Sequence, residues 1–300
     1  MPSAPTMPDL SASASRGDAA VRRDLELRAL GIRRGVVGFA HSDPAHPFHV
    51  GGSLSAADVL AALYGSVMHT GVDGTAWRDR DRFVLSKAHA ALALYIALSQ
   101  VGLLSEDDLS AGLTGPDAVL FRHPRRDVDR GIETSGGSLG MGLGYAAGLA
   151  LANRRRHLPG RVFCMVGDGE CNEGSIWESA AFVGHNALDG LTLIVDANGL
   201  QLDGPCAEIL DTGTLADRLS AFGFETSDVD GHDVMAVRDA LLPRTSRPRA
   251  VICHTVKGRG LSFVENRVEW HDHALTDEQY RVACAELDDA EEAIRDAAAV

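Results

Sequence analysis

Lysine is almost absent from this chain. Lys87 and Lys257 are the two lysines among 28 basic residues, and all the others are arginines. Codon usage in a GC-rich genome, which favours Arg, Ala and Gly, is a sufficient explanation for this bias. The two lysines are then retained either by chance or for a function, and the sequence alone leaves both explanations open.

An excess of positive charge is also missing. The chain carries 42 acidic residues and a formal net charge of −14. This balance argues against a nucleic-acid surface or an anionic membrane as the main partner. It leaves room for a small anionic ligand that a local group of positive side chains would hold.

The sequence lacks paired cysteines, a signal peptide and a membrane-spanning segment. Its five cysteines form no close pair, so we expect neither a zinc site nor a disulfide framework, and the composition fits a reducing cytoplasm. The longest apolar-leaning stretch, 138–152, contains four glycines and is too short to cross a bilayer. Residues 1–17, rich in Ser, Ala and Pro, are expected to form a disordered tail. Residues 18–300 are expected to form one domain that ends in an acidic helix.

Apolar residues recur with the periods of an α/β protein. The expected helices cover 18–39, 87–101, 138–156 and 173–186, with one more from residue 276. Ser55 and Asp58 are expected to form a capping box at the start of another helix. The expected strands cover 82–86, 161–166, 191–196 and 249–256. Because strand, helix and strand follow one another within 161–196, we expect a parallel sheet flanked by helices.

Two polar motifs directly follow two of the expected strands. Asp168 stands between two glycines after the strand 161–166, and Asn198 follows the strand 191–196. Ligands of an open α/β sheet bind at the carboxyl ends of its strands, and glycines let a ligand approach the backbone. Carboxylate and carboxamide oxygens suit Mg²⁺ or Ca²⁺, which commonly bind phosphate oxygens as well. Either motif alone is more often a plain turn or hairpin, but together they predict a cation and diphosphate site.

Five longer segments carry a family resemblance: FHVGGSLSAADVLAALYG, DRDRFVLSKAHAALALYIAL, GGSLGMGLGYAAGLALA, GDGECNEGSIWESAAFVGHNALDGLTLIVDANGLQLDG and TVKGRGLSFVENRVEWHDHA. They resemble the N-terminal half of transketolase, in the family's order and over residues 20–280. The resemblance implies the thiamine diphosphate-binding fold, with thiamine diphosphate and Mg²⁺ (or Ca²⁺) as cofactors.

The resemblance also implies roles for individual residues. Asp168, the side chain of Asn198 and the backbone carbonyl of Leu200 would ligate the cation. Glu173 matches a glutamate near the interface with the partner subunit. The segment along the cofactor's rings corresponds to Ser138, Leu139 and Gly140. The other residues expected to bind the cofactor are Gly167, Gly169, Glu170, His89, His271 and Lys257.

The family's active-site histidines correspond to His49, His89, His123 and His271. In thiamine chemistry the cofactor is the electron sink, and protein groups move protons on and off sugar-type hydroxyls. Histidine suits this task because its unperturbed pKa lies near neutrality. Both lysines also fall within family segments, which favours a role near the anionic cofactor or on a mobile active-site loop.

The chain departs from the family's usual pattern beside two of these histidines. Arg122 and Arg125 flank His123 in place of Gly and Glu, and Asp272 follows His271 in place of Gly. The metal motif and the four histidines persist, so we expect the cofactor chemistry to persist. The changes lead us to expect a specialised acceptor, as in natural-product biosynthesis.

Full-length transketolases continue into a pyrimidine-binding domain and a third domain, which this sequence does not contain. The resemblance therefore implies the large subunit of a split bacterial transketolase, which works with a C-terminal partner subunit in an α2β2 assembly. It would transfer a two-carbon ketol unit from a ketose phosphate donor to an aldehyde or other carbonyl acceptor. Two alternatives stay open: the decarboxylase subunit of a 2-oxo acid dehydrogenase, and a non-catalytic binding protein that retains the fold.

Overall fold

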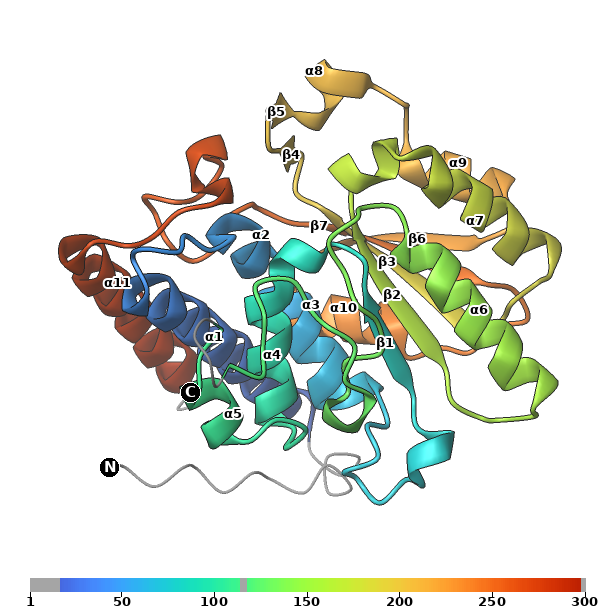
Figure 1. The fold of residues 1–300 in the computed structure, drawn as a ribbon, viewed down its shortest axis with the longest axis horizontal. Helices are drawn as coiled ribbons and strands as arrows, with labels where there is room; N and C mark the ends of the chain where they lie inside the picture. Colours follow the sequence, from blue (N-terminus) through green and yellow to red (C-terminus); the bar gives the residue numbers. More distant parts are fainter. Residues whose placement is uncertain (1–16, 114–117, 298–300) are drawn as a thin grey trace.

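The computed structural model describes residues 17–113 and 118–297. A five-stranded sheet forms its centre, in the order β1-β2-β3-β7-β6, and all neighbouring strands are parallel (Figure 1). The strands are β1 (Arg82–Leu85), β2 (Val162–Gly167), β3 (Leu191–Ala197), β6 (Glu225–Asp230) and β7 (Arg249–His254). The prediction of a parallel sheet flanked by helices is confirmed. Apart from Gly17, the expected tail lies outside the described residues.

One strand, β6, is not predicted from the sequence. Its residues ETSDVD are mostly polar, and it pairs with β7 alone, at the edge of the sheet. By contrast, all six residues of β2 are buried. The apolar pattern that identifies a buried strand is absent from β6 because none of its residues is fully buried.

Two apolar clusters lie on opposite faces of the sheet, as the alternation of side chains along a strand requires. Phe163 and Met165 of β2 belong to one cluster, whereas Val162, Cys164 and Val166 belong to the other. The first cluster includes residues of α1 (Asp18–Ser42), α3 (Ala57–Ala62), α4 (Ala91–Gln100) and α10 (Val234–Leu241). The second includes residues of α6 (Gly142–Arg155), α7 (Gly174–His185) and α9 (Leu215–Ala221).

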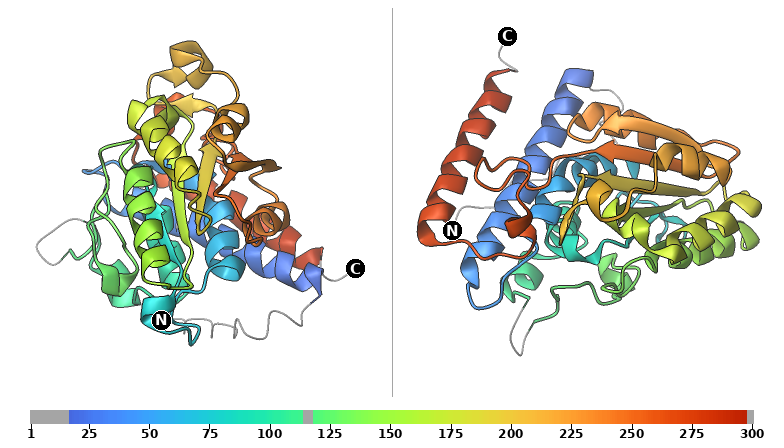
Figure 2. Two further views of the ribbon diagram at one scale, coloured as in Figure 1. Left: turned by 90° about the vertical axis from the view of Figure 1, so that its right-hand side faces the viewer. Right: turned by 90° about the horizontal axis from the view of Figure 1, so that it is seen from above.

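The acidic C-terminal helix α11 (Asp277–Asp296) packs along α1 at one end of the molecule (Figure 2). Arg34 of α1 donates hydrogen bonds to the carbonyl of Leu287 (3.1 Å) and to the carboxylate of Glu291 (2.8 Å). A capping box formed by Thr276 and Gln279 starts the helix. None of the helices in the described ranges is long and apolar enough to cross a membrane.

Shorter elements connect these layers. They are α2 (Val50–Ser55), α5 (Glu106–Ser110), α8 (Cys206–Leu210) and a π-helical turn (Leu63–Val67). Two short strands, β4 (Leu200–Gln201) and β5 (Gly204–Pro205), pair antiparallel and extend with α8 from the body of the molecule (Figure 1). The 3-10 turns are Trp77–Asp79, Ala88–Ala90, Val128–Arg130, Gly169–Asn172 and Val268–His271.

The capping box predicted at Ser55 is wrong. Ser55 ends α2, and its hydroxyl donates to the carboxylate of Asp196 at 2.6 Å. Asp58 accepts hydrogen bonds from Arg33 instead, and α3 begins without a side-chain cap. Both partners are distant in sequence, so the local pattern gives no sign of them. Two other helices begin later than predicted, α4 at residue 91 and α6 at residue 142.

We predict that Gly184→Ala destabilises the fold. Gly184 lies near the end of α7, and a Cβ added there would overlap the carbonyl oxygen of Phe222 after α9. Because a backbone carbonyl cannot turn aside as a flexible side chain can, α7 must shift. We expect the free energy of unfolding to fall by about 1–3 kcal/mol, measured as a lower melting temperature.

Gly148→Ala in α6 is the matched control, because no heavy atom other than the adjacent backbone of its own helix lies within 4 Å of its added Cβ. Because alanine has a higher helix propensity than glycine, the melting temperature of this variant should equal that of the wild type or be slightly higher. An unchanged melting temperature for Gly184→Ala would contradict the close approach of α7 to the end of α9.

Candidate functional site

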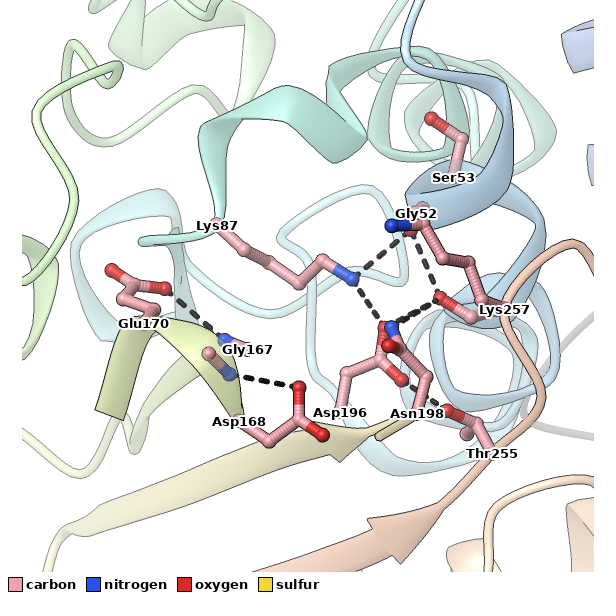
Figure 3. Close-up of polar contacts among 12 residues, drawn as sticks. Gly52, Ser53, Lys87, Gly167, Asp168, Glu170, Asp196, Asn198, Thr255 and Lys257 are labelled. Carbon is pink, nitrogen blue, oxygen red and sulfur yellow. Dashed lines mark hydrogen bonds and ion pairs between the residues drawn. The ribbon is translucent and has the colours of Figure 1, made fainter. Parts of the chain in front are cut away.

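The carboxyl ends of the parallel strands meet at one edge of the sheet, and Asp168 and Asn198 lie there on neighbouring strands (Figure 3). The carboxylate of Asp168 accepts hydrogen bonds from the backbone N–H groups of Gly169 (2.8 Å) and Gly199 (2.6 Å). Burial and the nearby carboxylate of Asp196 raise the pKa of Asp168. A buried carboxylate of this kind gains from a neighbouring cation.

Asn198 lies where β3 leaves the sheet. Its Oδ1 accepts a hydrogen bond from the N–H of Leu200 (3.0 Å), and its Nδ2 lies 3.5 Å from the hydroxyl of Ser55. Among the described residues, no group of three or more His, Cys, Asp or Glu side chains could hold a metal ion. A cation at Asp168 would therefore take its other ligands from amide, carbonyl, phosphate or water oxygens, which are ligands that Mg²⁺ and Ca²⁺ accept.

The loop after β2 packs tightly against the β4–β5 segment. A Cβ added to Gly169 would lie 2.8 Å from the Cβ of Gln201, so a larger residue would push the two segments apart. The side-chain Nε2 of Gln201 is buried and has no hydrogen-bond partner in the structure. A buried donor of this kind favours a ligand that brings an acceptor oxygen.

Glu170 holds this loop against two other segments. Its carboxylate accepts hydrogen bonds from the N–H groups of Gly140 (2.8 Å) and Gly167 (3.1 Å) and from the hydroxyl of Ser86. Burial raises the pKa of Glu170, and these hydrogen bonds lower it only in part. The described contacts of Glu170 are those of a support for the loop, and a direct contact with a cofactor stays a prediction.

The segment Ser138–Leu139–Gly140 leads into α6 on the side that faces solvent. Gly140 has a φ of +82°, which favours glycine, and an added Cβ would collide with Glu173 and Ser175. Leu139 is 39% exposed and Met141 is 63% exposed. Beside them lies a pocket of about 250 Å³ whose lining includes Ser138, Met141 and Tyr145. The predicted interface residue Glu173 is itself exposed, directly before α7.

The four predicted histidines come from four separate segments and meet in one cluster. The ring centroid of His49 lies 5.6 Å from that of His89, 5.4 Å from that of His123 and 5.3 Å from that of His271. Burial lowers the pKa of His49 and of His271 to about 4, and it lowers the pKa of His89 well below its usual value. These three rings are neutral at pH 7, so each offers one donor and one acceptor nitrogen.

Both lysines are buried beside this cluster. The Nζ of Lys257 donates to the Nδ1 of His271 at 3.1 Å, and within the described ranges Lys257 forms no ion pair with a carboxylate. Burial and the charge of Lys87 lower the pKa of Lys257 to about 8. Lys87 forms an ion pair with the buried Asp196 and donates to the carbonyl of Gly52 at 3.0 Å (Figure 3). The expected role beside an anion therefore suits Lys257, whereas the charge of Lys87 is balanced within the protein.

Sequence analysis does not single out Asp196, although it connects the parts of the site. Its carboxylate accepts hydrogen bonds from Lys87 and from the hydroxyl of Thr255 (Figure 3). It also accepts one from the hydroxyl of Ser55. One signal could have revealed it. Asp196 is a charged residue within the apolar strand LTLIVDA, and a charge in such a place is seldom tolerated without a partner.

Known proteins resemble this chain along most of its length. The family model described as "Transketolase, thiamine diphosphate binding domain" matches residues 36–288. The chain is 42% identical over 246 residues to "6-deoxy-6-sulfo-D-fructose transketolase subunit SqwG" of a Clostridium species, which covers 80% of this chain and 88% of that protein. It is 36% identical over 268 residues to an apulose-4-phosphate transketolase subunit of Actinobacillus succinogenes, which covers 89% of this chain and 96% of that protein.

Solved transketolases share the fold. The enzyme of Campylobacter jejuni superposes with a TM-score of 0.75 and 24% identity, over 92% of this chain and 45% of that chain. The enzyme of Leishmania mexicana gives a TM-score of 0.74 and 24% identity, over 91% of this chain and 46% of that chain. The chain thus spans less than half of these longer proteins, but most of the two relatives that are named as subunits. It belongs to the transketolase family and carries that family's thiamine diphosphate-binding domain.

Proposed function

We propose that the chain is the thiamine diphosphate-binding subunit of a split transketolase, which transfers a two-carbon ketol unit from a ketose donor to a carbonyl acceptor. One observation carries the proposal: the rings of His49, His89, His123 and His271, to which the resemblance assigns active-site roles, meet beside Lys257. A single domain over 18–300 and a cytoplasmic location belong to the same proposal.

The described residues fit thiamine diphosphate together with a divalent cation. Asp168, Asn198 and the carbonyl of Leu200 would hold the cation. Lys257 and the unpartnered Nε2 of Gln201 would face the diphosphate, whose charge would favour the protonated form of Lys257. The other contacts proposed for the cofactor are His89, His271, Ser138, Leu139, Gly140, Gly167, Gly169 and Glu170.

The chain's own chemistry is the binding of sugar hydroxyls and the movement of their protons. When bound, the cofactor supplies the electron sink for cleavage of a carbon–carbon bond. His49 and His271 are neutral at pH 7, because burial lowers their pKa to about 4. The unprotonated nitrogen of His49 can accept a hydrogen bond from a hydroxyl group, and a proton that this ring takes up is readily released again. The Nδ1 of His271 already accepts from Lys257, so its Nε2 carries the hydrogen and can donate it to a sugar oxygen.

The two alternative functions are weaker. The match to the transketolase family argues against the decarboxylase subunit of a 2-oxo acid dehydrogenase. A non-catalytic binding protein would have no need for four clustered histidines beside a buried lysine. Turnover of a ketose donor, compared with turnover of a 2-oxo acid and with no turnover, separates the three functions.

A C-terminal partner subunit completes the proposed enzyme, in an α2β2 assembly. Two relatives are named as transketolase subunits, and they match this chain over most of their length. Leu139, Met141 and Tyr145, three large apolar residues that are 39–63% exposed, lie on or beside the segment expected along the cofactor's rings. Exposed apolar residues grouped in this way are typical of a surface that another chain covers. Glu173 lies on the same side, where the partner's cofactor-activating glutamate is expected.

We predict that Asp168→Ala abolishes Mg²⁺-dependent cofactor binding and leaves the fold intact. Loss of the charged ligand should weaken thiamine diphosphate binding by at least about a hundredfold, or ~2.7 kcal/mol. The measurement is isothermal titration of the assembled complex with and without Mg²⁺, with circular dichroism to verify the fold. Asp203→Ala is the matched control, because Asp203 is an exposed aspartate between β4 and β5. Equal affinities for Asp168→Ala and the wild type would defeat the assignment.

We predict that the purified chain alone transfers no ketol unit and binds the cofactor weakly. In the proposed arrangement this chain would hold the diphosphate and one side of the cofactor's rings, and a carboxylate from another chain would be needed to activate the cofactor. Addition of the partner subunit should restore turnover and tighten cofactor binding together, as measured by coupled assay and titration. Ketol transfer by the homogeneous chain, at a rate that the partner does not change, would contradict the split arrangement.

We predict that the reconstituted enzyme prefers an acceptor other than the common pentose phosphate. Arginine and aspartate replace the family's usual residues beside His123 and His271, and the two relatives are named for different sugars. With ribose 5-phosphate we expect kcat/KM at least about tenfold below that of a full-length transketolase, or ~1.4 kcal/mol. Side-by-side assays on one donor measure this ratio. Equal efficiency would remove the reason for proposing a specialised acceptor, including one in natural-product biosynthesis.

A further inference from the structure

Arg122 connects three segments of the chain at the end of the histidine cluster where His123 lies, which we call the outer end. Its Nη2 donates to the carboxylate of Asp272 at 3.0 Å and also to the backbone carbonyl of Pro47. Its guanidinium lies 5.6 Å from the centroid of the Phe48 ring. One side chain therefore contacts residues 47–48 and 272, which are far from it and from each other in sequence.

Each of the three connected segments contains a histidine of the cluster. His49 directly follows Phe48, His123 follows Arg122, and His271 precedes Asp272. Phe48 also exchanges two backbone hydrogen bonds with His273, at 3.3 and 2.9 Å, so two of the three segments are joined twice. The positions of three rings thus depend on one group of contacts.

Stability alone does not account for this ion pair. The side chains of Arg122 and Asp272 are 33% and 43% exposed. Exposed ion pairs typically contribute about 0–1 kcal/mol, because water screens the charges and two side chains lose freedom. The ion pair therefore contributes little to the free energy of folding. Proton transfer, by contrast, requires several rings to be held in precise positions, and this requirement gives the ion pair a role.

Because of this ion pair, the two ends of the histidine cluster have different electrostatic surroundings. Lys87 and Lys257 act on the inner rings, His89 and His271, and both lower their pKa. Arg122 and Asp272 act on the outer ring, His123, with opposite signs. Partial burial and Arg122 lower the pKa of His123, and Asp272 raises it. His49 faces Asp272, Arg122 and Lys257 as well as the other three rings of the cluster.

We propose that Arg122 and Asp272 are a positioning pair, which orients His49 and His123 and balances the charge around them for substrate binding. The pair acts through the histidines, so neither residue is itself catalytic. The substrate part of this inference rests on the proposed function. The charge-balancing part concerns the chain's own residues and can be tested without turnover.

The first test measures the histidine titrations in the full-length chain by NMR, with signals assigned from single His→Gln variants. Removal of the cation in Arg122→Gln should raise the apparent pKa of His123, and removal of the anion in Asp272→Asn should lower it. The double variant should return it close to the wild-type value. Arg125→Gln is the control, because Arg125 also lies near His123 in sequence but its guanidinium lies 3.7 Å from the ring centroid of Phe121; it should produce a smaller shift.

The signs of the shifts decide the outcome. If the contact were purely structural, the pKa of His123 would shift in the same direction in both single variants, or would not shift in either. Either result overturns the proposal. Should Arg122→Gln fail to fold, Asp272→Asn decides alone, through a downward shift or its absence.

The second test uses the complex with the partner subunit. Each single variant should raise KM for the sugar substrate by about tenfold or more, ~1.4 kcal/mol, with cofactor affinity unchanged within about twofold. The charge-swapped variant, Arg122→Asp with Asp272→Arg, should recover part of this loss. Unchanged KM, or a loss that lies in cofactor affinity, refutes the substrate role of the pair. An inactive wild-type complex refutes the proposed function instead, and the NMR titration still decides whether the pair balances the charge around His123.

Discussion

The geometry of the site depends on a single buried carboxylate, that of Asp196. Burial alone would raise its pKa, but the charge of Lys87 together with hydrogen bonds from Lys87, Ser55 and Thr255 holds the pKa below its usual value. The hydroxyls of Ser55 and Thr255 donate to the same carboxylate, so groups from α2, the end of β1 and the residue after β7 converge on the end of β3. A buried ion pair adds little net stability, yet loss of one partner is costly because it leaves an unpaired charge. Such a pair therefore fixes where these segments meet.

The place where these segments meet determines the positions of the neighbouring functional groups. Asn198 lies two residues beyond Asp196, and His89 lies two residues beyond Lys87. Lys87 also donates to the carbonyl of Gly52, and a Cβ on Gly52 would lie 2.9 Å from the His89 ring. The ion pair thus sets the spacing between the strand-end oxygens and the inner histidines. It also leaves Lys257 as a second buried cation without a carboxylate partner in the described ranges, which suits an anionic ligand.

Local patterns and family resemblance predict different parts of this molecule. The apolar runs predict four of the five strands, and the position of two motifs after neighbouring strands predicts that Asp168 and Asn198 lie close together. The resemblance supplies the four histidines, and no spacing along the chain shows that their rings meet. The false capping box at Ser55 and the Arg122–Asp272 ion pair have a common explanation, because each depends on a partner more than 20 residues away, which a local pattern does not record. The strand β6 is missed for another reason: its residues are mostly polar and none is fully buried, so it has no apolar pattern.

The exposed side of the site connects cofactor binding with assembly. Inner groups such as Asp168 and Lys257 are supplied by this chain, whereas the segment expected along the cofactor's rings faces solvent with Leu139 and Met141. On the proposed function, a cofactor held there would contact this chain through its diphosphate and along the segment 138–140, and the partner subunit through the rest of its rings. A ligand that binds the assembled form better than the separate chains must stabilise the assembly by the same free energy with which assembly strengthens binding. In the proposed split enzyme, the concentration of cofactor is therefore a determinant of how much complete enzyme exists.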